Sequence, residues 1–147
     1  MPAPTSPRSL PAVIGPTENA LRALLLRLLA ATPLDSYEQW AALNLVDRTP
    51  GADQALIGAI GAGLVIDDAD ARAVLHSLAG TGLLHRVDDT WQVSPTGAGL
   101  LSRERRRVAE ATGRLVDGIP DTDLVTAVSV LDQVRARAHD ERAHLQQ

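Results

Sequence analysis

The chain has 147 residues and a formal net charge of −4, from 14 arginines, no lysine and 18 acidic residues. It contains no cysteine, which excludes disulfides and thiolate chemistry, and its four scattered histidines argue against a histidine metal site. The length suits one domain, and the richness in alanine and leucine, with no phenylalanine, favours helices around an aliphatic core over a large β-sheet. We expect no cofactor, no metal and no catalytic activity.

Four prolines and one arginine in the first fifteen residues do not fit a signal peptide. We expect residues 1–15 to form a flexible arm and residues 16–147 to form a single domain. Leucines at helical spacing predict a first helix from Thr17, whose hydroxyl could cap it, to about Ala31. No apolar stretch is long enough to cross a membrane, so a soluble, cytoplasmic protein without a membrane partner is expected.

Two short helices are predicted next. Ser36 and Gln39 have the spacing of a capping box, which predicts a helix from Ser36 to about Val46. A third helix, Ala52–Ile60, is expected to stop at the glycines that follow it, because glycine favours helix ends.

The fourth predicted helix covers Asp67–Thr81. The aspartates in its first turn suit the positive end of a helix dipole better than a calcium site, which needs more oxygens on a longer loop. After this helix the spacing of apolar residues is no longer helical. Two runs of residues that favour β-strands, 84–87 and 90–93, flank Asp88 and Asp89 and predict a small hairpin.

Two long helices are predicted to end the chain. Ser94 can cap a fifth helix, with Pro95 just inside its start, and the apolar pattern continues through Leu115. A sixth amphipathic helix is expected to begin with a cap at Asp121 or Thr122 and to run to about residue 142.

Three segments resemble the MarR family of bacterial regulators: Val74–Leu84, the join Val93–Gly97, and the tail Gly118–Leu124 leading to Val130 and Leu131. They occur in the family's order over residues 17–142. The resemblance implies a mainly α fold: a winged helix-turn-helix lobe over about 35–95, with a two-stranded β-hairpin wing, and dimerisation helices over about 17–31 and 95–142.

The same resemblance implies a homodimer that presents two reading helices to successive major grooves of double-stranded DNA. The reading helix corresponds to Asp67–Thr81 and the wing to Leu84–Val93. In this family, a small-molecule effector in the crevice between the lobe and the dimer arms changes the affinity for DNA.

Few residues of the lobe can contact DNA. Arg72 and His76 lie four apart on one face of the reading helix, with Ser77 beside them, and Arg86 on the wing could reach a phosphate or the minor groove. The alternative is structural: Arg72 pairs with Asp68 on the helix surface, and His76 is merely solvated.

The charge distribution weighs against strong binding. Residues 50–100 carry six acids and two arginines, so the whole net charge of −4 falls on the lobe, including Asp88 and Asp89 at the wing tip where related wings usually carry an arginine. We expect weak, salt-sensitive DNA binding unless the run Arg103–Arg107, with Arg103 as the candidate contact, compensates. The alternative for this run is a solvated surface, with Arg106 paired to Glu110.

Tyr37, Trp40 and Asn44 share one face of the second helix, which lines the effector crevice in the family's architecture. An aromatic wall with an amide suits a planar or phenolic ligand, and Arg22 or Arg107 could supply a cation to an anionic one. The alternative is that Trp40 is a core residue of a protein without phenylalanine.

The leading hypothesis is therefore a homodimeric MarR-type regulator of transcription, modulated by a small ligand. A second hypothesis, motivated by the acidic lobe, is a winged-helix dimer with weak or lost DNA binding that acts as a ligand- or protein-interaction module. A third is a dimerisation domain like those of small-molecule O-methyltransferases, which have a similar join, but the chain leaves no room for a methyl-donor domain.

Overall fold

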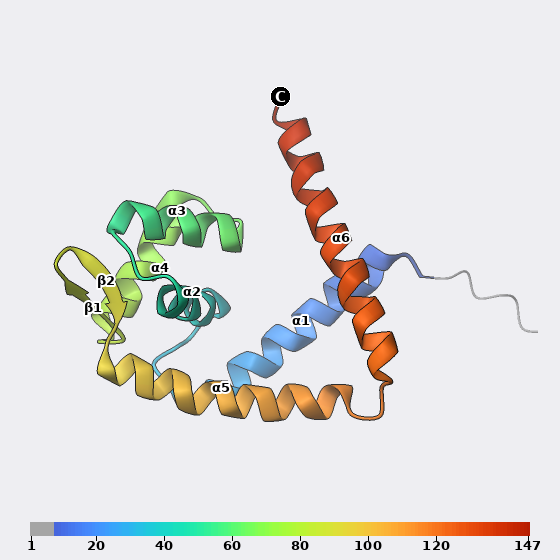
Figure 1. Ribbon diagram of the computed structural model, residues 1–147, viewed down its shortest axis with the longest axis horizontal. Helices are drawn as coiled ribbons and strands as arrows, with labels where there is room; N and C mark the ends of the chain where they lie inside the picture. Colours follow the sequence, from blue (N-terminus) through green and yellow to red (C-terminus); the bar gives the residue numbers. More distant parts are fainter. Residues whose placement is uncertain (1–7) are drawn as a thin grey trace, which may run out of the picture. The chain divides into compact units, whose positions relative to one another are not determined.

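The computed structural model describes residues 8–147, which divide into two compact units, 8–109 and 110–147. The first unit holds the helices α1 (Leu10–Leu28), α2 (Tyr37–Arg48), α3 (Asp53–Leu64) and α4 (Asp68–Gly80), the strands β1 (Leu84–Val87) and β2 (Thr90–Val93), and most of α5 (Pro95–Val116) (Figure 1). The second unit holds the end of α5 and α6 (Asp121–Leu145). The expected mainly α fold with a two-stranded hairpin is confirmed.

The hydrophobic core lies in the first unit, where α2, α3, α4 and the hairpin gather into one lobe (Figure 1). Its members are aliphatic except for Trp91, as the composition required. The fully buried side chains include Leu29, Leu43, Leu56, Ile57, Ile60, Leu75, Leu78, Leu83 and Leu101. This core fixes α3 and α4 relative to each other.

The N-terminal helix begins earlier than expected. It starts at Leu10, so residues 10–15 of the expected arm are helical, whereas residues 1–7 of that arm lie outside the described residues. Pro11 needs no N–H at the first turn, and Pro16 removes only one bond near the helix start. Thr17 therefore does not cap the helix: it lies inside, and its hydroxyl donates back to the Val13 carbonyl at 2.7 Å.

The expected glycine stop of the third helix is wrong, because α3 continues through Gly61 to Leu64. It ends with Val65 in the left-handed conformation, at φ 56°, and the N–H groups of Val65 and Ile66 both donate to the Gly61 carbonyl. A Cβ on Gly61 would lie 3.1 Å from the Ile66 carbonyl oxygen. Gly61 thus permits the close approach of the turn that ends the helix one residue beyond Gly63.

The predicted hairpin is confirmed, and its register places Leu84 opposite Val93 and Val87 opposite Thr90. Asp88 and Asp89 both have positive φ, 49° and 61°. Positive φ at both central residues of a two-residue hairpin loop is typical of a type I′ turn, a type that the two aspartates alone do not predict. The strands lead directly into α5.

The join between the hairpin and α5 confirms the predicted cap. The Ser94 hydroxyl accepts from the Gly97 N–H at 3.0 Å and donates to the Gly82 carbonyl at 2.5 Å. A Cβ on Gly97 would overlap the Leu83 carbonyl oxygen, so only glycine fits where α5 crosses the start of β1.

The sixth helix begins at Asp121 after Pro120, without a side-chain cap, so the expected cap at Asp121 or Thr122 is not formed. Proline suits a helix start because its φ is preset, and Asp121 then contributes charge to the first turn. Within residues 8–147, no helix is long and apolar enough to span a membrane.

Candidate functional site

The helix pair α3 and α4 is joined by only three residues, 65–67, and forms a helix-turn-helix. The Asp67 carboxylate caps α4 by accepting from the Asp70 N–H at 2.8 Å. Ala71, Leu75 and Leu78 bury the inner face of α4 in the core, which leaves the opposite face outward. This is the geometry in which a second helix can enter a DNA groove.

Two of the predicted DNA contacts lie on the outward side of α4. His76 is exposed and Arg72 is half-buried, and neither has a hydrogen bond or ion pair within residues 8–147. The alternative pair of Arg72 with Asp68 therefore does not form. Arg72 keeps all its N–H donors available for a phosphate or a base edge.

Ser77 has a different position. Its hydroxyl accepts from the Gln39 side-chain N–H at 2.7 Å, and the Gln39 side-chain oxygen Oε1 accepts from the Asp35 backbone N–H at 2.8 Å. Gln39 is only 7% exposed, so this contact holds the start of α2 against α4. The capping-box spacing located Gln39, but its partner on a distant helix could not be read from the sequence.

The wing is anchored to the start of α3. Trp91 donates from its indole N–H to Asp53 at 3.0 Å, and its backbone pairs with Gly51 beside the hairpin. The guanidinium of the exposed Arg86 lies over the Trp91 ring, 4.9 Å from its centroid. Stacking orients Arg86 while leaving its N–H groups free to donate.

The arginine run of α5 is mostly paired within the first unit. Arg103 and Arg107 donate to the two carboxylate oxygens of Glu104, at 2.8 and 2.7 Å, and Glu104 is only 1% exposed. Arg105 pairs with Asp47 at 2.8 Å and donates to Asn44 at 2.8 Å. The net charge of this run is thus partly neutralised by acids that hold α5 in place.

Glu104 was not predicted to be buried, although the sequence contains a signal. It follows Leu100 and Leu101 at helical spacing and so falls on the buried stripe of α5. Arg103 remains a candidate DNA contact only through its terminal N–H groups, because its Nε donates to Glu104.

Each of the three predicted ligand contacts on α2 has neighbours of its own. Asn44 is engaged by Arg105 and by the Trp40 carbonyl, and Trp40 packs half-buried against the core. Tyr37 lies under the guanidinium of Arg22, 4.6 Å from the ring centroid.

Arg22 links the first two helices. It pairs with Glu18 on α1 and, at 3.1 Å, with Glu38 on α2. The hydrogen bond to Glu18 raises the pKa of Arg22 above its usual value, although burial acts in the opposite direction. With both acids bound, Arg22 is a connector of α1 to α2 and to the Tyr37 ring.

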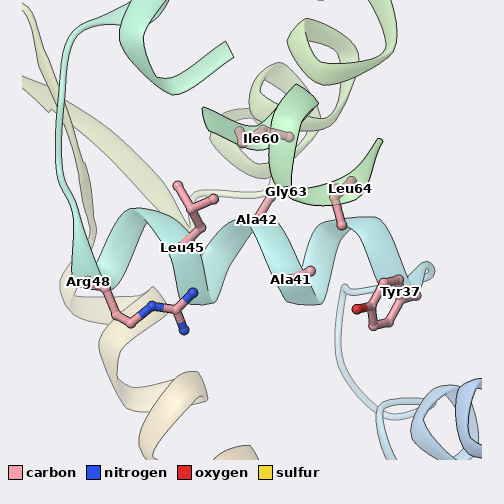
Figure 2. Close-up of a pocket in the computed structure, with 8 residues that line it drawn as sticks. All are labelled: Tyr37, Ala41, Ala42, Leu45, Arg48, Ile60, Gly63 and Leu64. Atoms are coloured by element: carbon pink, nitrogen blue, oxygen red, sulfur yellow. The ribbon is translucent and has the colours of Figure 1, made fainter. Parts of the chain in front are cut away.

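A cavity of about 190 Å³ lies instead between α2 and α3 (Figure 2). Its lining comprises Tyr37, Ala41, Ala42, Leu45, Arg48, Ile60, Gly63 and Leu64. Tyr37 is the one predicted ligand contact among them. The recurrence of 37, 41, 45 and 48 along one face of α2 could have indicated this cavity, but its partner helix could not be identified from the sequence. No group of three or more metal-ligating side chains occurs within residues 8–147.

Comparison with solved structures shows which known fold this architecture resembles. The chain is similar to a MarR family transcriptional regulator from Silicibacter pomeroyi, with a TM-score of 0.76, 17% identity, and coverage of 91% of this chain and 95% of that one. The fold is that of the MarR family regulators. The sequence itself matches no protein-family model and no curated protein.

Two further solved structures have comparable similarity to this chain. BldR, a transcriptional regulator from Sulfolobus solfataricus, has a TM-score of 0.72 and 14% identity over 87% of this chain and 93% of its own. CouR from Rhodococcus jostii, solved with bound p-coumaroyl-CoA, has a TM-score of 0.71 and 18% identity over 86% of this chain and 91% of its own.

Proposed function

We propose that this protein is a homodimeric, cytoplasmic transcriptional regulator of the MarR type that binds double-stranded DNA and catalyses no reaction. The observation that carries the proposal is the outward face of α4, with Arg72 and His76 unpaired within the described residues, beside a wing that orients Arg86. These side chains would contact phosphates and base edges while the Gln39–Ser77 hydrogen bond holds α4 against α2.

The homodimer is supported by the apolar surface of the second unit. On α6, Val125 is 70% exposed, Val128 60% and Leu131 45%. A run of exposed apolar side chains along one helix is typical of a surface that another protein surface covers. A second copy of the chain provides such a surface, and its symmetry would set two reading helices one DNA turn apart.

We also propose that a small ligand, with an aromatic compound as the first candidate, modulates DNA binding. Tyr37, Trp40 and Asn44 remain the candidate contacts, with Tyr37 favoured because its hydroxyl has no partner within residues 8–147 and because its ring connects to α1 through Arg22. A ligand that binds the DNA-competent and DNA-incompetent states unequally would shift their populations.

The test is fluorescence anisotropy with a labelled duplex, at low and at near-physiological salt. We expect micromolar binding at low salt that falls steeply as salt rises. Arg72→Ala and Arg86→Ala should each lower the salt slope by about one per lobe. The matched control is Arg27→Ala, an exposed arginine in the last turn of α1 without an ion pair in the described chain, which should bind like the wild type. No binding at micromolar protein would contradict the proposal.

A second candidate function is a winged-helix dimer with weak or lost DNA binding that serves as a ligand- or protein-interaction module. Two observations favour it: the net charge of −4 over residues 50–100 and the pairing of Arg103, Arg105 and Arg107 with acids. In that case Arg72→Ala would leave the cellular phenotype intact, while charge reversal of Asp88 and Asp89 would disrupt it.

A further inference from the structure

The cavity between α2 and α3 has two polar groups without protein partners at its ends. Arg48, in the last turn of α2, makes no hydrogen bond or ion pair within residues 8–147, although the adjacent Asp47 is paired with Arg105. The Tyr37 hydroxyl, in the first turn, also has no partner in the described chain. Figure 2 shows the guanidinium and the hydroxyl pointing toward each other along α2. The site therefore offers a cation and a hydrogen-bonding group to one bound molecule.

The walls between these two groups are aliphatic. Leu45 of α2 faces Ile60 and Leu64 of α3, and Ala41 lies between the two polar ends (Figure 2). A Cβ on Gly63 would make an ordinary van der Waals contact with a methyl group of Leu45, at 3.8 Å, and so would occupy part of this space. At about 190 Å³ the cavity is smaller than the roughly 300–1,000 Å³ of drug-sized sites, so its occupant is a small molecule.

We propose that this cavity binds a small organic carboxylate with an aliphatic body. The carboxylate would pair with the forked N–H donors of Arg48, and the chain would lie against Leu45 and Ile60 with its far end toward Tyr37. The site lies between α2 and α3, and its Arg48 and Gly63 are exposed to solvent.

The location couples the site to the reading helix, and this consequence rests on the proposed function. The cavity residues Ile60, Gly63 and Leu64 belong to the last two turns of α3, immediately before the residues 65–67 that lead into α4. A carboxylate held between α2 and α3 would favour one spacing of these helices, and hence one placement of α4.

The experiment is a titration of the full-length protein with hexanoate, followed by amide chemical shifts in ¹H–¹⁵N NMR spectra. We expect saturable shifts at Ala41, Leu45 and Gly63. Two further probes separate the contribution of the carboxylate charge from that of the alkyl chain. 1-Hexanol, which lacks the charge, should bind at least tenfold more weakly than hexanoate, and inorganic phosphate, which lacks the chain, should not shift these amides. Shortening the chain by one methylene should weaken binding about fourfold while the cavity is being filled.

Variants localise the site. Arg48→Gln should raise the Kd for hexanoate at least tenfold, whereas Arg27→Gln, the matched last-turn arginine of α1, should leave it unchanged. Gly63→Ala should weaken hexanoate binding while raising Tm, because the added methyl fills the cavity and favours the helix. Weaker hexanoate binding by a Gly63→Ala variant with a higher Tm could not be attributed to unfolding of the variant.

An unchanged Kd in Arg48→Gln, or shifts that map away from α2 and α3, would overturn the proposal. Because hexanoate binding is measured without DNA, its outcome is independent of the duplex titration. Failure to bind duplex DNA would contradict the proposed function but would not affect the evidence for the carboxylate site. Failure to bind hexanoate would overturn the site and leave the proposed DNA binding intact.

Discussion

Val65 adopts a left-handed backbone conformation, φ 56° and ψ 47°, that a β-branched residue rarely occupies. The cost is about 1–2 kcal/mol for a residue with a Cβ, and glycine does not incur it. We expect Val65→Gly to raise the free energy of unfolding by about 1 kcal/mol after the greater flexibility of unfolded glycine is subtracted.

The measurement is urea denaturation followed by circular dichroism. Val65→Asn serves as the graded control, because asparagine tolerates the left-handed region better than valine, and it should fall between the wild type and the glycine variant. A loss of stability in Val65→Gly would mean that the side chain, which is 47% exposed, contributes more by packing than its backbone costs.

Glu104 is the buried acid that organises the arginine run. Glu104→Gln keeps the shape but turns an amide N–H toward an arginine donor. We expect it to lower the free energy of unfolding by about 1–2 kcal/mol, a range reduced because the Arg103 and Arg107 side chains are 60% and 44% exposed. Chemical denaturation measures the change, and Glu110→Gln, an exposed acid on the same helix, is the control. Equal effects of both changes would show that burial of Glu104 has no special weight.

At the scale of elements, the wing turn places two acids where a type I′ turn prefers asparagine and glycine. Asp88→Asn with Asp89→Gly should raise the free energy of unfolding by about 1 kcal/mol, because glycine relieves the positive φ at the second position. The same double variant removes two negative charges from the wing tip, so the proposed DNA binding should tighten, as measured by anisotropy at low salt.

A charge-matched control separates the wing from net charge. Asp121→Asn with Asp123→Asn removes two charges from the first turn of α6, in the second unit. If both double variants tightened DNA binding equally, the effect would come from net charge alone, and the wing would not approach the duplex.

At the scale of the whole molecule, the proposed dimer depends on the apolar face of α6. Val128→Glu places a charge on a side chain that is 60% exposed in the single chain and buried if a second copy covers it. We expect this variant to sediment as a monomer at concentrations where the wild type is a dimer. Val87→Glu on the wing, where the valine is 43% exposed, is the matched control and should leave the mass unchanged. A dimeric Val128→Glu variant would exclude this face from the interface.

Much of the architecture was readable from local signals. Ser36 and Ser94 cap helices as their spacing predicted, and the change of period after residue 83 located both strands to the residue. These features depend on contacts within a few residues. The start of α1 was missed because proline near a helix beginning permits either a break or an early turn, and the residues themselves do not decide between them.

The candidate site was less predictable. The sequence placed Arg72 and His76 on one face of the reading helix, and the element order with its family-like joins predicted the MarR fold. The contacts that support these residues could not be predicted, because each joins residues far apart in the chain: Gln39 with Ser77, Asp53 with Trp91, and Asp47 with Arg105.

By itself, then, the sequence determined a helical protein with a wing and placed its entire net charge of −4 within residues 50–100. Only the tertiary structure decided which arginines remain unpaired. Packing of α5 against α2 brings Arg105 to Asp47, and burial of Glu104 recruits Arg103 and Arg107. The physical reason is that a buried carboxylate requires charged partners, so the arginines expected to offset the acidic lobe largely serve its fold.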